Sequence, residues 1–328
     1  MSSVLVTGGA GFIGSHIAET LLAEGHQVVV LDNLDPYYDV GIKRRNVERC
    51  RETGGDRFAF VEGSVTDEAL VRETFAEHDV GFVYHEAAQA GVRTSVENPM
   101  KPHEVNTTGL LYVLQAAAEF GVERLVNASS SSVYGVPEYL PYDEEHPNHP
   151  RSPYAVTKLT AEHYARVWND LYDVPTVSLR HFTVYGPRMR PNMAITNFTT
   201  RCLNGENPVI FGDGQQTRDF TYIDDIVAAN LALLDTDAAD GEVLNVGSTG
   251  TITIQELAEH IVEATGADVE IEYADAKAAD ARHTQADVSR ARELLGYEPT
   301  TSIREGVSRF VDWYRENREW YEPLVLNS

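Results

Sequence analysis

Short apolar runs alternate with amphipathic segments in the first half of the chain. Between the first two apolar runs, Ile13, Ile17 and Leu21 recur at helical spacing up to Gly25, which predicts a helix over residues 13–24. A second helix is predicted over residues 107–120. Strands are predicted over residues 4–7, 28–31, 58–62, 80–85 and 123–128. Apolar strands alternating with helices are typical of an α/β fold with a Rossmann-type, doubly wound parallel sheet.

The alternation of strands and helices ends after about residue 180, where Gly- and Pro-rich segments separate short elements. Two helices are predicted near the end, over residues 254–265 and 303–317, and residues 244–247 are expected to rejoin the main sheet. We therefore expect an interleaved boundary between a large domain and a smaller C-terminal α/β lobe. The large domain takes residues 1–180 with 225–248 returning to it, and the lobe takes residues 181–224 and 249–328.

The charge balance excludes several classes of function. With 51 acidic and 26 basic residues, the net charge of −25 argues against nucleic-acid binding, which needs basic surface. No apolar stretch of about 18 residues predicts a membrane span, and the first residues lack the pattern of a secretion signal. A cytoplasmic protein is expected. The acid-rich, lysine-poor composition favours a surface adapted to high salt, where repulsion between like charges is screened.

Neither cysteine chemistry nor a metal site is predicted. Cys50 and Cys202 lie far apart and lack the spacing of a metal or redox motif. His146 and His149 lie in a Pro-rich loop without ligand-type spacing. The pair Asp224-Asp225 is better explained as the N-cap and first-turn charge of a helix.

A glycine-rich segment links the first predicted strand to the first helix. Gly8, Gly11 and Gly14 have the spacing GxxGxxG, in which glycine allows a tight turn and lets the backbone approach a pyrophosphate at a helix N-terminus. Asp32 ends the next strand. A carboxylate at this place suits the ribose hydroxyls of NAD and repels the 2′-phosphate of NADP. The segment therefore predicts an NAD site.

Tyr154 and Lys158 stand one helical turn apart at the start of a predicted helix that runs to about Tyr172. An ammonium beside a phenol favours the phenolate, so Tyr154 is a candidate base. A run of serines from Ser129 to Ser132 ends the strand before this helix. Together with the glycine turn, these residues predict redox chemistry on a hydroxyl group.

With these motifs, the chain resembles the extended short-chain dehydrogenase/reductase family, and within it the nucleotide-sugar 4-epimerases, especially those acting on UDP-glucuronate. The resemblance covers nearly the whole length. Its stretches are TGGAGFIG (7–14), HEAAQAGVR (85–93), ASSSSVYG (128–135), SPYAVTK (152–158), RHFTVYGPRMRPNMA (180–194), GDGQQTRDFTYIDDI (212–226) and LLGYEPTTSI (294–303).

The resemblance implies that Tyr154 is the base and acid at the sugar 4-hydroxyl. Lys158 binds the nicotinamide ribose and lowers the pKa of the tyrosine, and Ser130 relays or orients the proton. Ser64 departs from the family, which commonly has Asp there to meet the adenine, so backbone near Val65 is expected to serve instead. The expected cofactor-binding set is Gly8, Gly11, Phe12, Ile13, Gly14, Asp32, Asn33, Ser64, Val65, Ala87, Ala88, Gln89, Asn106, Tyr154 and Lys158.

Arginines and small hydroxyl residues are implied on the substrate side. Arg218 and Arg282 match positions used for the UDP phosphates, with a surface ion pair as the lesser alternative for each; the sequence around Arg282 diverges from the family. An arginine is expected to meet the C5 carboxylate of glucuronate. The expected substrate-binding set is Arg93, Ser130, Ser131, Ser132, Thr183, Arg188, Arg190, Asn197, Arg218 and Arg282.

The implied reaction is NAD-dependent 4-epimerisation of a UDP-sugar through a 4-keto intermediate, with UDP-glucuronate favoured. UDP-glucose or its N-acetyl form is the main alternative. Sugar-nucleotide dehydratases and UDP-glucuronate decarboxylases typically carry acids at the positions of Ser131 and Ser132, which disfavours both. A dehydrogenase that releases NADH and a non-catalytic NAD-binding protein remain open. The resemblance also implies a homodimer formed through the two helices at about 107–120 and from Tyr154 onward.

Overall fold

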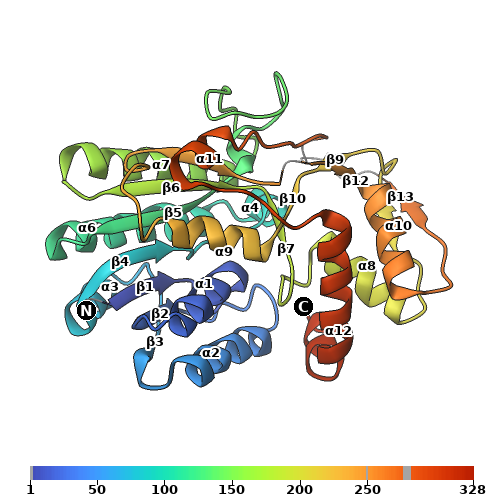
Figure 1. The fold of residues 1–328 in the computed structure, drawn as a ribbon, viewed down its shortest axis with the longest axis horizontal. Helices are drawn as coiled ribbons and strands as arrows, with labels where there is room; N and C mark the ends of the chain where they lie inside the picture. Colours follow the sequence, from blue (N-terminus) through green and yellow to red (C-terminus); the bar gives the residue numbers. More distant parts are fainter. Residues whose placement is uncertain (1–2, 249, 276–281) are drawn as a thin grey trace.

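The fold is centred on a seven-stranded parallel sheet (Figure 1). The computed structural model describes residues 3–248, 250–275 and 282–328. The strands follow the order β11-β6-β5-β4-β1-β2-β3, so the chain winds outward from β1 in both directions. They are β1 (Ser3–Thr7), β2 (Val28–Asp32), β3 (Phe58–Glu62), β4 (Val80–His85), β5 (Arg124–Ser130), β6 (Thr176–His181) and β11 (Val243–Val246). This order confirms the doubly wound fold that the sequence predicts.

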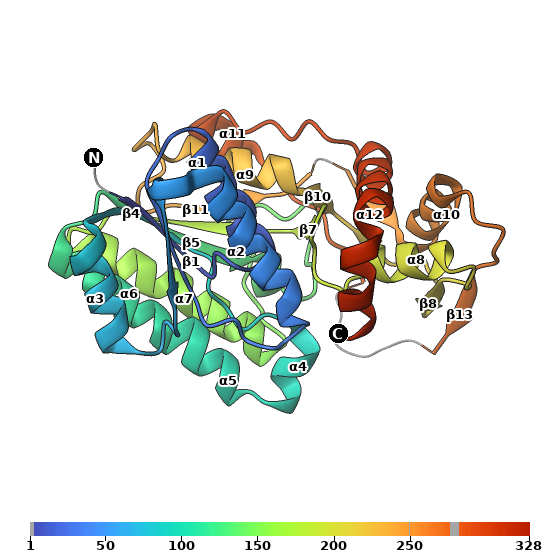
Figure 2. The same ribbon diagram turned by 90° about the horizontal axis from the view of Figure 1, so that it is seen from below.

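Helices cover both faces of the sheet (Figure 2). One face carries α1 (Phe12–Ala23), α2 (Val40–Gly54), α9 (Ile223–Ala232) and α11 (Ser289–Leu295). The other carries α3 (Glu68–His78), α6 (Leu110–Phe120) and α7 (Pro153–Leu171). Strands β1 and β2 are buried along their whole length, as expected for a sheet sandwiched between two helical layers. In the described residues, no helix combines the length and apolarity that a membrane crossing requires.

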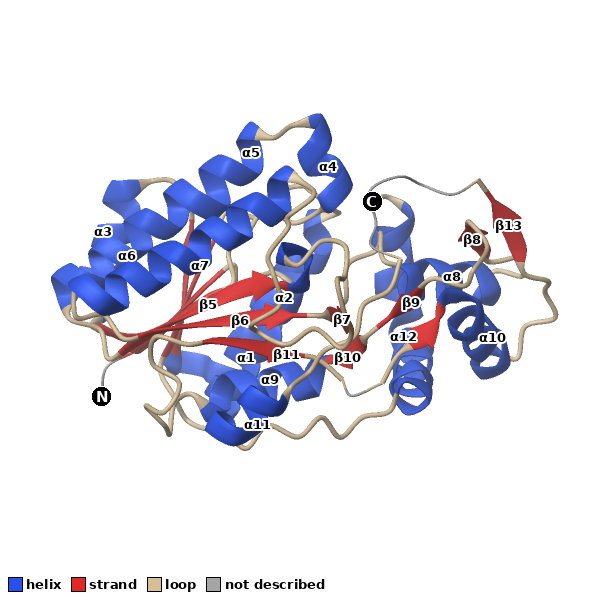
Figure 3. Ribbon diagram, turned by 90° about the horizontal axis from the view of Figure 1, so that it is seen from above, coloured by secondary structure: helices blue, strands red, loops and turns tan. Residues whose placement is uncertain are grey.

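A smaller α/β part lies beyond the carboxyl ends of the strands, on the right of Figure 3. Its helices among the described residues are α8 (Ala194–Leu203), α10 (Ile254–Thr265) and α12 (Ile303–Leu326). Its short strand pairs are β8 (Val209–Phe211) with β13 (Glu272–Ala274), and β9 (Thr217–Arg218) with β12 (Ile252–Thr253). The parallel pair β7 (Thr183–Tyr185) and β10 (Phe220–Tyr222) joins it to the main sheet. The chain returns through α9 and β11, which pairs with β6.

Some boundaries differ from the predicted ones. The helix predicted from residue 107 belongs to a longer run that begins with α5 (Met100–Pro102) and continues through a π-helical turn over His103–Gly109 into α6, and the separate α4 (Val92–Glu97) precedes it. The last helix passes Asn317 and reaches Leu326, because Tyr321 and Val325 pack into the core and extend the buried face. Tyr222, rather than Asp224, occupies the N-cap of α9, while Asp224 and Asp225 lie in the first turn.

Candidate active site

The glycine turn between β1 and α1 is packed too tightly for side chains. Gly8 has a φ of +68°, and a Cβ placed on it would lie 2.6 Å from the backbone nitrogen of Ala87. A Cβ on Gly14 would lie 2.6 Å from the carbonyl oxygen of Gly8. Because both contacts are with backbone, any side chain would displace the turn from the sheet. The turn therefore exposes bare backbone at the start of α1.

The amino end of α1 has the properties of an anion site. Gly11 is its N-cap, and no side chain within the described residues caps the helix. The N–H groups of the first turn, which includes Phe12 and Ile13, thus face outward with the positive end of the helix dipole. This arrangement can hold the pyrophosphate of a dinucleotide.

Asp32 lies beside the same turn at the end of β2. Its Oδ2 accepts a hydrogen bond from the backbone of Ala10 at 3.1 Å, and its Oδ1 accepts one from Leu34 at 2.8 Å. Lys43 Nζ lies 3.9 Å from Oδ1. These contacts fix the carboxylate at the edge of the glycine turn, where it can accept hydrogen bonds from ribose hydroxyls and would repel a phosphate there.

Asn106 links the loop after β4 to α7. It lies in the π-helical turn, where its Oδ1 accepts a hydrogen bond from the backbone of Gln89 at 2.7 Å. Its Nδ2 donates to Thr157 Oγ1 on α7 at 2.9 Å. The π-helical turn thus places the Asn106 amide between the loop after β4 and α7. Turns of this kind are frequent at functional sites. The expected residues Ala87 and Ala88 precede Gln89 and are partly exposed.

Three expected cofactor residues lie at the ends of β2 and β3. Ser64 Oγ is 2.7 Å from Thr66 Oγ1 and accepts a hydrogen bond from the Thr66 backbone at 3.2 Å, so this serine shapes its own turn. The Val65 side chain is buried against Gly109. Asn33 is exposed, and its Oδ1 accepts a hydrogen bond from the Asp35 backbone at 3.0 Å.

Tyr154 stands on the first turn of α7, next to the end of β5. Ser152 caps this helix by accepting a hydrogen bond from the Ala155 backbone at 3.1 Å, and Pro153 opens it. Ser130, the last residue of β5, forms a hydrogen bond with the Tyr154 phenol. Lys158 Nζ lies 6.0 Å from the centroid of the Tyr154 ring. The structure therefore brings the three predicted catalytic residues together.

Burial raises the pKa of Tyr154 above its ordinary value. The hydrogen bond with Ser130 and the positive charge of Arg190 act in the opposite direction. Lys158, which the sequence assigns to lowering this pKa, donates to the carbonyl oxygen of Ala128 at 2.6 Å, and burial lowers its own pKa to about 8. Ser130 and Arg190 are thus two groups that favour the phenolate, and the effect of Lys158 on Tyr154 stays a prediction.

Glu86 is a member of the site that sequence reasoning missed. It follows β4 and precedes Ala87, and burial raises the pKa of its carboxyl to about 7 while the charge of Lys158 opposes this. In turn, the charge of Glu86 raises the pKa of Lys158 and of Tyr154. An acid between the end of an apolar strand and two alanines is the signal that could have revealed it.

Hydroxyl groups and an arginine lie toward the substrate side. Ser131 and Ser132 form a short 3-10 turn after β5, and Ser132 Oγ is buried with no hydrogen-bond partner among the described residues. Thr183 opens β7 and is partly exposed. The guanidinium carbon of Arg190 lies 5.8 Å from the centroid of the Tyr37 ring. Tyr37 was also missed, because it belongs to a loop far away in the sequence.

Two arginines of the smaller part lie next to each other. Arg218 Nη1 donates to the carbonyl oxygen of Arg282 at 3.2 Å. Arg282 Nη2 donates to Asp213 Oδ2 at 2.9 Å, and its side chain is 65% exposed. The smaller part thus offers two guanidinium groups near one surface. Arg282 is engaged in an exposed ion pair with Asp213, and a phosphate ligand can replace this ion pair at little cost in free energy.

Arg188, which the sequence places in the substrate-binding set, instead packs against α1. Its backbone has a φ of +64°, and its Nη2 donates to Glu19 on α1 at 2.8 Å. Only 4% of the residue is exposed, so its guanidinium ties the smaller part to α1. Two further expected substrate residues, Arg93 on α4 and Asn197 on α8, lie on exposed surface.

Residues 5–310 match the family described as GDP-mannose 4,6 dehydratase. The chain belongs to this family. Family members similar to it include proteins named as epimerases, which confirms the resemblance to the extended short-chain dehydrogenases/reductases. A UDP-glucuronate 4-epimerase of Thermodesulfobacterium geofontis is 39% identical, and the match covers 99% of this chain and 100% of that protein.

Solved structures of family members have the same fold. A Bacillus cereus UDP-glucuronic acid 4-epimerase in complex with UDP-glucuronic acid and NAD superposes with a TM-score of 0.89 at 34% identity, covering 96% of this chain and 99% of that one. A Thermotoga maritima UDP-glucose 4-epimerase with UDP-glucose has a TM-score of 0.89 at 35% identity, with coverage of 96% and 99%. The family thus includes epimerases with charged and with neutral sugars.

Proposed function

We propose that the protein is an NAD-dependent nucleotide-sugar 4-epimerase that converts UDP-glucuronate to UDP-galacturonate. The observation that carries the proposal is the 39% identity, over 99% of this chain, to a protein named as a UDP-glucuronate 4-epimerase. The positive charge of Arg190 lowers the pKa of Tyr154, and this guanidinium is the candidate to meet the C5 carboxylate of a sugar whose C4 hydroxyl faces Tyr154. Similar proteins named as UDP-glucuronate 4-epimerases support this substrate.

The cofactor is NAD. The bare backbone of Gly8 and Gly14, the uncapped amino end of α1 and the carboxylate of Asp32 fit a dinucleotide with free ribose hydroxyls. Asn106 and Lys158 would border the nicotinamide half. Bound NAD⁺ supplies the hydride acceptor that oxidation at C4 requires and the donor that the return step requires.

Tyr154 takes the proton of the 4-hydroxyl and later gives it back. Ser130, hydrogen-bonded to the phenol, favours the ionised form and passes or orients the proton. The 4-keto sugar must present its other face before reduction. Arg218 and Arg282 hold the UDP phosphates through this turn, so the sugar moves while the nucleotide stays in place.

The serines after Ser130 favour epimerisation over the other reactions of the family. Dehydration or decarboxylation needs an additional acid or base near the sugar. Ser131 and Ser132 offer hydroxyl groups there, and the buried Oγ of Ser132 is suited to bind a sugar hydroxyl. Epimerisation at C4 needs the proton transfer that Tyr154 performs and the hydride that NAD would accept and return, and it needs no second acid or base.

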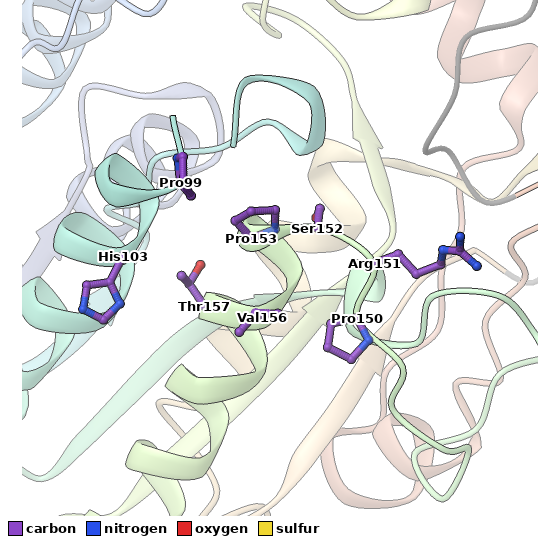
Figure 4. A pocket seen from close by; sticks show the side chains of 8 residues that line it. All are labelled: Pro99, His103, Pro150, Arg151, Ser152, Pro153, Val156 and Thr157. Atoms are coloured by element: carbon purple, nitrogen blue, oxygen red, sulfur yellow. The ribbon is translucent and has the colours of Figure 1, made fainter. Parts of the chain in front are cut away.

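We also propose a homodimer formed through α6 and α7. Val156, Val167 and Leu171 lie on one face of α7 at helical spacing, with 48%, 40% and 74% of their surfaces exposed. An open hollow of about 670 Å³ between α5 and the start of α7 continues this face (Figure 4). A second copy would cover these apolar side chains. Sedimentation of the parent and of Leu171→Glu tests this: the parent sediments as a dimer and the variant as a monomer.

One incubation tests the proposed activity. Purified protein, without added NAD, is mixed separately with UDP-glucuronate, UDP-glucose and UDP-N-acetylglucosamine, and the C4 configuration of each product is determined. We expect UDP-galacturonate from UDP-glucuronate, with no CO₂ released. Conversion of UDP-glucose alone would replace the proposed substrate, and CO₂ release would indicate a decarboxylase. A requirement for added NAD in stoichiometric amounts would indicate a dehydrogenase.

A further inference from the structure

Tyr37 reaches the substrate side of the site from the nucleotide-binding half. It belongs to the loop between β2 and α2, five residues beyond Asp32, and is half-buried. Its ring faces the Arg190 guanidinium, whose central carbon lies 5.8 Å from the ring centroid. Its hydroxyl accepts a hydrogen bond from Asn192 Nδ2 at 3.2 Å. Two neighbours in the loop between β7 and α8 therefore hold one aromatic side chain.

A third loop completes the enclosure of Tyr37. Gly91 follows β4 and has a φ of +115°, and a Cβ on it would lie 2.5 Å from the Tyr37 hydroxyl oxygen. A side chain at this position would push the phenol away. The missing side chain at Gly91 thus gives Tyr37 its room, and the ring is held between the loop after β4 and the loop before α8.

We propose that Tyr37 is a positioning residue for Arg190, and that it sets the preference of the site for a sugar carrying a carboxylate. This inference rests on the proposed function, because it assigns to Arg190 the C5 carboxylate of UDP-glucuronate. An arginine side chain has many rotamers, and fixing it on binding costs conformational entropy. The face of Tyr37 holds the guanidinium in place beforehand through a cation–π contact.

The other contacts of the Arg190 side chain are weak, so Tyr37 is the residue that can hold the guanidinium in place. The Arg190 guanidinium donates a hydrogen bond to Met193 Sδ at 3.5 Å, and a thioether is a weak acceptor. The charge of Arg190 lowers the pKa of both Tyr154 and Tyr38, and Tyr38 follows Tyr37 in the same loop. A neutral sugar makes no ion pair with Arg190, and its binding should not depend on Tyr37.

Calorimetric titration of the full chain, purified with NAD, tests this role. Tyr37→Leu removes the ring, and we expect the Kd for UDP-glucuronate to rise about tenfold, while the Kd for UDP stays within about twofold. Tyr37→Phe keeps the ring and should raise the Kd for UDP-glucuronate about threefold or less. Tyr172→Leu is the matched control, because Tyr172 is an exposed tyrosine at the far end of α7. It should change neither value.

A double-mutant cycle separates positioning from general damage. If Tyr37 acts through Arg190, Tyr37→Leu should raise the Kd for UDP-glucuronate by less than about twofold in an Arg190→Ala background. An equal rise in both backgrounds, or a matching rise for UDP, would overturn the inference. Should Tyr37→Leu fail to fold, Asn192→Ala, an exposed substitution, takes its place. It should weaken binding of UDP-glucuronate about threefold and leave UDP unchanged, and no change would overturn the inference.

The two proposals fail in different ways. Absence of UDP-galacturonate after incubation of the parent would contradict the proposed function. The role of Tyr37 is read from binding, so it is contradicted only by the Kd values. If the parent itself bound UDP-glucuronate no more tightly than UDP-glucose, the preference assigned to Arg190 and Tyr37 would be wrong.

Discussion

Glu162 and Arg180 form a two-pronged ion pair beneath the catalytic helix. Arg180 Nε and Nη2 donate to the two carboxylate oxygens of Glu162 at 2.9 and 2.7 Å, and the side chains are 4% and 3% exposed. Glu162 lies one turn after Lys158 on α7, and Ser129 of β5 also donates to it. The pair fastens the helix that carries Tyr154 to β5 and β6.

Breaking this pair should destabilise the fold. Glu162→Gln leaves the buried guanidinium of Arg180 without its counter-ion, and we expect the free energy of unfolding to fall by about 3–5 kcal/mol. Urea titration measures this. Glu263→Gln is the control, because Glu263 pairs with Arg304 on exposed surface, and a loss under about 1 kcal/mol is expected. Equal losses in the two variants would contradict the structural role of the buried pair.

Ser130→Ala should shift the pH dependence of the reaction. The hydrogen bond with Ser130 lowers the pKa of Tyr154, so its removal raises that pKa. Less phenolate is then present near neutral pH, and the rising limb of kcat/KM moves to higher pH. We expect a rate about tenfold lower or more at pH 7. Ser178→Ala, at a buried serine of β6 that bonds Asn127, should leave the profile in place.

Glu86→Gln should move the alkaline, falling limb of the pH profile of kcat/KM. The pKa of Lys158 is about 8, and the carboxylate of Glu86 raises it. Removing that negative charge makes the ammonium less favourable, so the pKa of Lys158 falls and activity declines at lower pH than in the parent. An unchanged alkaline limb of kcat/KM would argue that Lys158 does not control it.

Glu86→Gln should also increase the free energy of unfolding, although it reduces activity at alkaline pH. Because the pKa of Glu86 is raised from 4.5 to about 7, the folded chain keeps a proton that the unfolded chain loses between these values. The contribution of this carboxyl to stability is therefore present at low pH and is lost as the pH rises through 7. Urea titration should show Glu86→Gln gaining stability relative to the parent between pH 5 and pH 8.

Salt should stabilise the protein. With a net charge of −25, repulsion across the surface acts over about 10 Å at 0.1 M salt and about 3 Å at 1 M. We expect Tm to rise by several degrees between these concentrations of KCl. A Tm that does not depend on salt would remove the case for a surface adapted to high salt.

The sequence predicted the sheet, and it placed Tyr154 near Lys158, because these signals are local. Apolar strands, the glycine turn and the spacing of Tyr154 and Lys158 are each readable within a few residues. The strands over 58–62 and 80–85 match β3 and β4 of the structure in both bounds. The order of the strands confirms the doubly wound topology.

What the sequence missed depends on contacts between distant segments. Tyr37 meets Arg190 only because two loops converge, and Arg188 is removed from the site by Glu19, far earlier in the chain. The hydrogen bond from Lys158 to the Ala128 carbonyl likewise joins a helix to a strand 30 residues earlier. Contacts between segments that are distant in the sequence cannot be predicted from a pattern of neighbouring residues.

Replacement of the Tyr154 phenol tests the central claim most directly. Tyr154→Phe keeps the ring and removes the hydroxyl that exchanges the proton at C4, so the rate of UDP-glucuronate epimerisation should fall by about a thousandfold. NAD released from the denatured variant should equal that from the parent, which shows that the cofactor site is intact. A variant that interconverts the two sugars as fast as the parent would contradict the account.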